Sequence, residues 1–334
     1  MINNSSANYK YIYSNDFNEV TNMILSVSRR TDIPNYYSDW FYERIKEGFL
    51  YVRNPFNMHQ ISKINLSPDV VDCIVFWTKN PLPMMNRLYE LDDYKYYFQF
   101  TLTGYGKDIE PNIPHKKDAM ISVFIELSKR IGKDRVIWRY DPILINDIYT
   151  IEYHEKAFDQ IAERLHPYTN KVVISFIDLY AKTVRNTRDL SIEELNTETV
   201  IDMAQKFSNI AKKYNLTIES CAEKIDLEQY GVGHGSCINK NTIENIIGCK
   251  INCGKDKNQR RECGCIESID VGMYNSCKNG CKYCYANYND NMVMKNTQLY
   301  DIHSPILCSK LSDEDIITER NVKSVKDNQL YLFK

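Results

Sequence analysis

The cysteines of this 334-residue chain are concentrated in one segment. Of the 11 cysteines only Cys73 precedes residue 221, and the other ten lie between Cys221 and Cys308. A secreted disulfide scaffold is short and carries its cysteines along its whole length. Thiols gathered into one part of a long chain are typical instead of a metal site in a reducing compartment. The skew therefore predicts a cytoplasmic protein with a metal centre towards the C-terminus.

Charge and hydropathy narrow the class of protein further. The 42 basic and 44 acidic residues give a net charge of −2, which argues against a protein that binds nucleic acid or membranes mainly by electrostatic attraction. No apolar run reaches the roughly 18 residues of a membrane span, and the N-terminus has no apolar signal core. We therefore expect no membrane partner.

Short apolar runs alternate with helical patterns along the first two thirds of the chain. Nearly continuous hydrophobicity predicts strands that are buried on both faces of a parallel sheet. The predicted strands are 24–28, 73–78, 96–103, 136–140, 172–177 and 216–220, and the predicted helices are 40–46, with Ser38 as N-cap, 120–131, 155–165 and 200–214. This alternation predicts an α/β fold, a (β/α) TIM-like barrel that is partial or closed.

Changes in composition along the chain predict three regions. Residues 1–20 are predicted to be a polar arm and residues 21–235 the (β/α) barrel, with a hairpin or loop excursion at 51–67. Residues 236–334 are rich in Gly, Asn, Lys and Cys and are predicted to be an iron–sulfur region. Their one strand-like run, 266–274, leads directly into the densest cysteines and would be the last barrel strand.

Cys277, Cys281 and Cys284 have the spacing C-x3-C-x2-C. Iron–sulfur clusters are held by cysteine thiolates, and a 4Fe–4S cubane needs four of them. Three thiolates on one loop would therefore leave one iron open to a small molecule, as a catalytic zinc site keeps an open position. A zinc knuckle is the competing interpretation and would need a fourth ligand such as His303 or Cys308.

This motif, with Tyr283 as its aromatic residue, resembles the signature of radical S-adenosylmethionine enzymes. The resemblance implies a 4Fe–4S cluster on the three cysteines and S-adenosylmethionine on the fourth iron. Reductive cleavage would yield a 5′-deoxyadenosyl radical that abstracts hydrogen from a substrate. It also implies an external electron donor of the flavodoxin or ferredoxin type, and it places Tyr283 near the adenine.

The whole chain also resembles one bacterial family, the domain-of-unknown-function family 1848. The matching segments are SVSRRTDIP (26–34), VRNPFN (52–57), CIVFWTKNP (73–81), FTLTGYG (100–106), WRYDPI (138–143), ISFIDLY (174–180), ESCAEKIDL (219–227) and residues 259–288. The order of the TKN and R-x-D-P-I segments is similar to spore photoproduct lyases. That likeness implies that Lys79 lies near the S-adenosylmethionine carboxylate, whereas a G-G-E segment for the amino group is not visible.

The cysteine motif comes late in this chain, whereas in radical S-adenosylmethionine enzymes it usually follows the first strand. The first and last strands of a barrel are neighbours, so a circular permutation would preserve the site. We then expect 266–274 to lie beside 24–28, with the cysteines facing the carboxyl ends of the other strands. The alternative is an appended ferredoxin-like module, which would not face those ends.

Barrel active sites lie at the carboxyl ends of the strands, so polar residues directly after the strands are candidates for catalysis. The catalytic candidates are Arg29, Arg30, Asp32, Arg139, Asp141 and Glu223. Each could also be an ordinary salt-bridged residue at the rim.

Further cysteines are numerous enough for a second site. The preferred set is Cys221, Cys237, Cys263 and Cys265, and Cys249 and Cys253 are the competing pair. An auxiliary 4Fe–4S cluster, a structural zinc ion and no second metal all stay open. Cys73, on a buried strand, is expected to be a small core residue.

These observations predict a cytoplasmic radical S-adenosylmethionine enzyme on a permuted barrel. The alternative from another class is a non-catalytic iron–sulfur or zinc protein in electron transfer or nucleic-acid binding. The substrate does not follow from the sequence. The lyase likeness makes a nucleic acid a candidate, but the near-neutral charge gives it no support.

Overall fold

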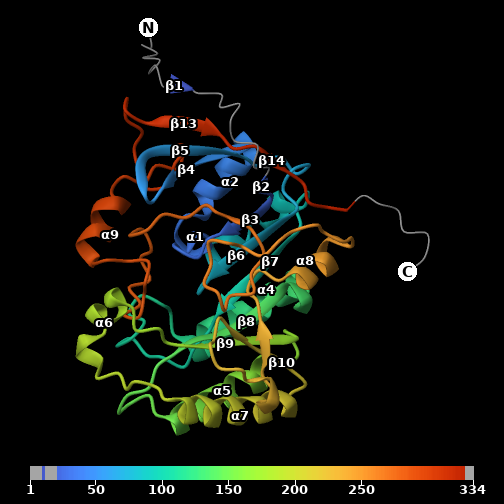
Figure 1. The fold of residues 1–334 in the computed structure, drawn as a ribbon, viewed down its shortest axis with the longest axis vertical. Helices are drawn as coiled ribbons and strands as arrows, with labels where there is room; N and C mark the ends of the chain where they lie inside the picture. Colours follow the sequence, from blue (N-terminus) through green and yellow to red (C-terminus); the bar gives the residue numbers. More distant parts are fainter. Residues whose placement is uncertain (1–9, 12–20, 328–334) are drawn as a thin grey trace, which may run out of the picture.

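An eight-stranded parallel sheet forms the centre of the computed structural model, which describes residues 10–11 and 21–327 (Figure 1). The polar arm predicted at 1–20 lies almost entirely outside the described residues. In chain order the strands are β3 (Ile24–Val27), β6 (Cys73–Thr78), β7 (Tyr96–Thr101), β8 (Val136–Ile143), β9 (Lys171–Phe176), β10 (Thr217–Cys221), β11 (Gly233–Gly235) and β12 (Ile269–Asp270). All six strands that the sequence predicted up to residue 220 are present.

The order of the strands in this sheet is β11-β10-β9-β8-β7-β6-β3-β12. The last strand, β12, pairs in parallel with the first, β3, with Ile269 opposite Leu25 and Asp270 opposite Ser26. The predicted neighbourhood of 266–274 and 24–28 is therefore confirmed. Within the described residues β11 and β12 are the two ends of the order and are not paired with each other, so closure into a barrel is not seen.

Helices pack around the sheet, most of them on its outer face and the helix 240–247 on its inner face among the cysteines. They are α1 (Ile33–Tyr36), α2 (Ser38–Glu47), α3 (Leu82–Met85), α4 (Ile121–Ile131), α5 (Ile151–Leu165), α6 (Ala181–Asn186), α7 (Thr197–Lys213), α8 (Lys240–Ile247) and α9 (Asp290–Thr297). The four predicted helices correspond to α2, α4, α5 and α7. Ser38 is not the N-cap that the sequence predicted, because the helix begins at Ser38 itself and Tyr37 precedes it without a side-chain cap.

Alternate residues of each strand face opposite sides of the sheet and enter different cores. On β6 and β7, Phe76 and Phe98 point into the large core beneath the helices. Val75 and Tyr97 point to the inner face instead, where Cys237, Cys263 and Cys265 pack against them. Cys73 lies fully buried on this inner face, as the sequence predicted. The cysteine-rich segment between β11 and β12 therefore covers the inside of the curved sheet.

A smaller sheet lies at the end of the molecule where the described chain begins (Figure 1). Its order is β1 (Lys10–Tyr11), β13 (Ile316–Glu319), β5 (Asn57–Asn65) and β4 (Phe49–Asn54), and a separate pair joins β14 (Val322–Lys323) to β2 (Thr21–Asn22). Strands β4 and β5 form an antiparallel hairpin, which confirms the excursion predicted at 51–67. Among the described residues, none of the helices combines the length and apolar character needed to span a bilayer.

Candidate functional site

The loop that carries Cys277, Cys281 and Cys284, here called the triad loop, begins a few residues after β12. Cys277 and Cys281 are buried, and Cys284 is partly buried. Burial, with smaller effects of the neighbouring Asp32 and Cys284, raises the pKa of Cys277 to about 12. Burial also raises the pKa of Cys281 well above its ordinary value, against the opposing effect of the Lys79 ammonium. The thiols are thus protonated in the absence of a metal. Binding a metal would require them to lose their protons.

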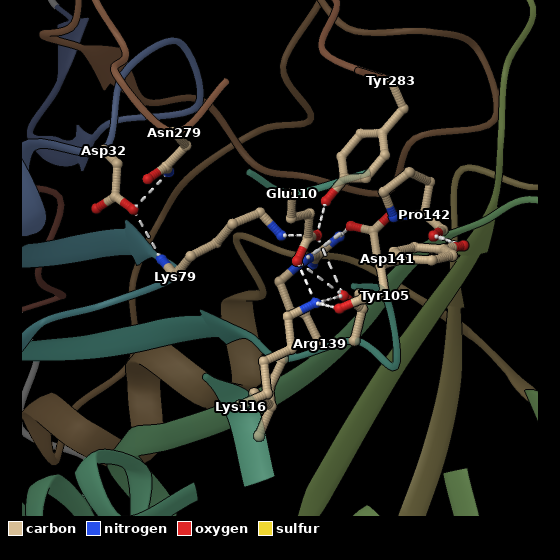
Figure 2. A network of polar contacts seen from close by, with 12 residues as sticks. Asp32, Lys79, Tyr105, Glu110, Lys116, Arg139, Asp141, Pro142, Asn279 and Tyr283 are labelled. Carbon is tan, nitrogen blue, oxygen red and sulfur yellow. Dashed lines mark hydrogen bonds and ion pairs between the residues drawn. The ribbon is translucent and has the colours of Figure 1, made fainter. Parts of the chain in front are cut away.

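Asp32 fixes the triad loop to the carboxyl ends of two strands (Figure 2). Its Oδ2 accepts a hydrogen bond from Asn279 Nδ2 of the triad loop at 3.0 Å and another from the backbone N–H of Lys79, directly after β6, at 2.8 Å. Its Oδ1 accepts from the backbone N–H of Asn35 at 3.2 Å and so caps α1. Asp32, a predicted catalytic candidate, is therefore placed as a buried brace of the triad loop.

The segment after β7 packs against the other side of the triad loop. The backbone N–H of Lys282 donates to the carbonyl of Ile109 at 3.0 Å, and Asn112 Nδ2 donates to the carbonyl of Lys278 at 2.7 Å. Gly280 has φ of 69°, and a Cβ at this position would lie 3.0 Å from Pro111 Cγ. Only glycine meets both the left-handed backbone and this close approach.

Glu110, from the same segment, is the centre of a buried charge network (Figure 2). Lys79 Nζ donates to its Oε1 at 2.9 Å, Lys116 Nζ pairs with its Oε2, and Tyr283 of the triad loop donates through its hydroxyl. Burial alone would raise the pKa of Glu110, but the two ammonium groups hold it at about 2. Burial likewise opposes the charge of Lys79, but the Glu110 carboxylate raises its pKa above the ordinary value. The network is therefore an ionised cluster beside the thiols.

Lys79 and Tyr283, the two predicted cofactor contacts, lie close together. The Lys79 ammonium is 5.5 Å from the centroid of the Tyr283 ring, and its charge acts on Cys281. Lys79 follows β6 directly, as the sequence predicted, but its partner here is Glu110. No motif or strand end in the sequence marks that carboxylate.

Arg139 and Asp141 form a second buried pair on β8. Arg139 Nε donates to Asp141 Oδ2 at 3.0 Å, and the other carboxylate oxygen accepts from the Ser175 hydroxyl. Burial opposes the charge of both groups. Cys237 and Asp141 nevertheless raise the pKa of Arg139 well above its ordinary value, and Arg139 and Ser175 lower the pKa of Asp141. The charge of Asp141 also acts on Lys79, so this pair belongs to the same electrostatic environment as the Glu110 network.

The other three catalytic candidates are spread along the edge of the sheet. Glu223 accepts from the backbone N–H of Phe176 at 2.8 Å, and burial, with smaller effects of nearby carboxylates, raises its pKa to about 7. Arg30 Nε lies 3.8 Å from Asp270 Oδ1, and its guanidinium lies over the Tyr274 ring. Arg29 donates through Nη2 to Ser268 Oγ at 3.2 Å. The six candidates are therefore not brought to one point.

Cys221, Cys237, Cys263 and Cys265 are brought together on the inner face of the sheet, as a second set. Cys221 ends β10, and its Sγ lies 2.7 Å from that of Cys237. Cys237 in turn contacts Cys265, and Cys265 contacts Cys263. In the competing pair, Cys253 Sγ instead lies near the carbonyls of Gly254 and Glu267, at 3.7 and 3.9 Å. Within residues 10–11 and 21–327, no three His, Cys, Asp or Glu side chains already surround a common point as metal ligands would.

Sequence reasoning missed four polar residues of the site: Glu110, Lys116, Asp270 and Asn279. Glu110 and Lys116 lie in the irregular segment after β7, where no periodicity marks a buried charge. Asn279 lies inside the cysteine motif, at a position where the motif accepts any residue. Asp270 ends β12 and was open to the strand-end argument that found Asp32 and Asp141.

Comparison with known proteins gives one family. No curated protein matches the chain. Among solved structures, a Bacteroides thetaiotaomicron protein described as an alpha-L-fucosidase matches 78% of this chain and 91% of its own, with 11% identity and a TM-score of 0.25, values that support no argument about fold or function. The model of a family described as a domain of unknown function, DUF1848, matches residues 24–286. The chain therefore belongs to the DUF1848 family, as its sequence segments indicated.

Proposed function

We propose that this protein is a radical S-adenosylmethionine enzyme. The observation that carries the proposal is the position of the triad loop. Three thiols, two of them buried and one partly buried, lie beside Lys79, at the carboxyl end of β6, and beside an ionised carboxylate and a tyrosine hydroxyl. The carboxyl edge of a parallel sheet is where such folds carry their active sites.

The thiols fit a cluster with one open iron. Cys277, Cys281 and Cys284 would be its ligands, and in the described residues no fourth thiol comes from the triad loop itself. When bound, the cluster would supply the electron that cleaves S-adenosylmethionine, and the resulting radical would abstract a hydrogen atom from the substrate. An external donor of the flavodoxin or ferredoxin type would deliver that electron to the protein.

The Glu110 network fits the amino-acid end of S-adenosylmethionine. That end carries an ammonium and a carboxylate, and charged groups of opposite sign recognise each most strongly at short range. Lys79 offers a buried cation, and Glu110 offers a buried anion 2.9 Å away. In our proposal Lys79 binds the carboxylate, and Glu110 takes the place of the missing G-G-E segment in binding the ammonium. Tyr283, which donates to Glu110, orients that carboxylate.

The strand order supports a permuted barrel rather than an appended module. The triad loop follows β12, which pairs with the first strand β3, and Asp32 ties the loop to the segments after β3 and β6. An appended ferredoxin-like module would fold apart from these strand ends. We therefore propose that the motif occupies its usual place in space although it comes last in the chain.

Product formation tests the proposal. The full chain is reconstituted anaerobically with iron and sulfide, reduced with dithionite and given S-adenosylmethionine. We expect 5′-deoxyadenosine from the wild type and from Cys249→Ala, which removes a partly buried thiol outside the triad, and none from Cys281→Ala. Cluster-loaded wild type that makes no 5′-deoxyadenosine would overturn the proposal. Zinc in the triad without iron, after anaerobic purification, would favour the non-catalytic binding protein instead.

The substrate is the open part of the proposal. Nucleic acid remains a candidate from the lyase likeness, and a peptide or small metabolite is equally compatible with the site. A comparison of metabolites in cells that carry the wild type or Cys281→Ala would identify a compound that accumulates when the triad is broken.

A further inference from the structure

The second thiol set differs in spacing from the triad. Its four sulfurs form a continuous row of contacts from Cys221 through Cys237 and Cys265 to Cys263, with 2.7 Å between the first two. In the part of the chain that the structure describes, no such contact joins the triad thiols, which act on one another only through charge. The sulfurs of the second set are therefore in contact with one another, whereas those of the triad are not.

This difference bears on what each set can hold. Four thiolates at about 2.3 Å from one tetrahedral ion lie only about 3.8 Å from one another. A 4Fe–4S cluster needs its thiolates farther apart, because each one binds a different iron. The contacting sulfurs of the second set match the shorter spacing of a site for a single ion. Because Cys221 and Cys237 are closer together than an ion would hold them, binding requires their side chains to rotate apart by about 1 Å.

The surroundings of the second set carry positive charge that the protein leaves partly unmatched. Arg139 Nη1 donates to Cys237 Sγ at 2.8 Å, and the backbone N–H of Ile238 donates to Cys265 Sγ at 3.3 Å. Arg29 lies within electrostatic reach of Cys265 and Cys237, and its buried Nε has no hydrogen-bond partner. Both guanidinium groups lie over the Trp77 ring, at 5.5 Å for Arg29 and 5.3 Å for Arg139.

A buried cation without a full complement of partners is costly. Four thiolates on a divalent ion carry a net charge of −2, which two guanidinium groups would balance. Arg139 also pairs with Asp141, so the charge at this position is shared. The unpartnered Nε of Arg29 thus indicates that an anionic group belongs beside it.

The position of the four cysteines indicates what the ion would do. Cys221 belongs to β10, whereas Cys237, Cys263 and Cys265 belong to the segment that covers the inner face of the sheet. The carbonyl of Cys237 also accepts from Tyr97 and Gln99 of β7, at 2.9 and 2.7 Å. An ion here would join that covering segment to the strands beneath it.

We propose that Cys221, Cys237, Cys263 and Cys265 bind a single divalent ion of the zinc class in a closed structural site. The ion pins the cysteine-rich segment to the inner face of the sheet and contributes directly to folding. This site is independent of the triad and of the reaction proposed for it, since none of its ligands is shared.

Metal analysis of a chain without the triad tests the proposal. The variant Cys277→Ala/Cys281→Ala/Cys284→Ala is expressed with both iron and zinc in the medium, purified anaerobically without chelator, and analysed for zinc, iron and sulfide. We expect about one zinc per chain and no iron or sulfide. On this background Cys263→Ala should lose the zinc, and the matched variant Cys249→Ala should keep it.

A second measurement covers the case in which Cys263→Ala does not fold. The triple variant is stripped of zinc and titrated with Co²⁺, and thiolate-to-cobalt absorption should saturate at about one equivalent. About four irons with sulfide would overturn the proposal in favour of an auxiliary cluster. So would a chain that takes up neither zinc nor cobalt, or a disulfide between Cys221 and Cys237 in the anaerobic, metal-free protein.

Discussion

Glu110 is the common ion-pair partner of two cationic side chains at the site. Its carboxylate is buried between the ammonium groups of Lys79 and Lys116 and also accepts from the Tyr283 hydroxyl. A buried ion pair contributes little net stability compared with apolar residues, but removing one partner leaves the other as an unmatched charge. The carboxylate is therefore the member of the network whose loss affects all the others.

Replacing this carboxylate should destabilise the fold. Glu110→Gln keeps the shape of the side chain but leaves two buried ammonium groups without a counter-ion, and we expect a loss on the order of 3 kcal/mol in the free energy of unfolding at neutral pH. Denaturant unfolding of the metal-free chain measures it. Adding Lys116→Met to Glu110→Gln should recover part of the loss. Strict additivity of the two changes would contradict the network.

The effect of Glu110→Gln on the free energy of unfolding should depend on pH. Because the folded protein lowers the pKa of Glu110 from 4.5 to about 2, its stabilisation is fully present above pH 4.5 and is lost as the pH falls towards 2. The difference in unfolding free energy between wild type and Glu110→Gln should therefore be constant from pH 7 to about 5 and narrow below that. A difference that widened in acid would have the wrong sign.

Single residues of the site were predictable only where a motif or a strand end marked them. The cysteine spacing identified Cys277, Cys281 and Cys284, and the end of β6 identified Lys79. Glu110 lies nine residues beyond the end of β7, in a segment whose course depends on packing against the triad loop. No local pattern reports such long-range contacts, so its role becomes visible only in three dimensions.

At the scale of elements, the strands were easier to predict than the boundaries of the helices. Strands buried on both faces are nearly continuous apolar runs, and β6 matches its predicted range. Ser38 failed as an N-cap because a serine in the first turn and a serine before it have the same sequence signature. Strand β11, a Gly-His-Gly stretch, carries no apolar signal and was not predicted.

The triad loop depends on glycine for a reason that can be separated from backbone strain. Gly280 and Gly248 both have positive φ, 69° and 77°, but only at Gly280 would a Cβ meet neighbouring atoms. Gly280→Ala and Gly248→Ala should each lose about 1 kcal/mol of stability from the backbone alone. Only Gly280→Ala should also lower the iron bound per chain after reconstitution. Equal iron content in both variants would show that the contact with Pro111 is unimportant.

At the scale of the whole molecule, a strand from late in the chain, β12, extends the large sheet beyond the first strand, β3. The sequence predicted that the last strand lies beside the first, and the pairing of β12 with β3 confirms it. It did not predict that residues between β11 and β12 fill the inner face of the sheet. That segment is rich in Gly, Asn and Lys, so its path is set by the thiols and by contacts such as Tyr97 with Cys237 rather than by local periodicity.

Asp270 connects β12 to β3 through hydrogen bonds. Its two carboxylate oxygens accept from the hydroxyls of Ser26 and Ser28 at 2.9 and 2.7 Å, and from the backbone N–H groups of Arg29 and Gly272 at 2.8 and 3.0 Å. With β12 only two residues long, these bonds supply much of what holds it to β3. The position of the triad loop relative to the strand ends then depends on this one side chain.

Asp270→Ala should therefore loosen the junction without unfolding the rest of the sheet. We expect a loss of about 2 kcal/mol or more, since buried donors are left without acceptors. Hydrogen exchange should rise in 24–30 and 269–286 but not in β9 and β10, which lie on the far side of the sheet. Asp226→Ala, which removes an exposed carboxylate that accepts one backbone N–H, is the matched control and should leave both regions protected. If exchange rose equally in all strands, β12 would be an integral part of one cooperative unit. If it rose only in 24–30 and 269–286, Asp270 would be the residue that holds β12 and the triad loop against the edge of the sheet at β3.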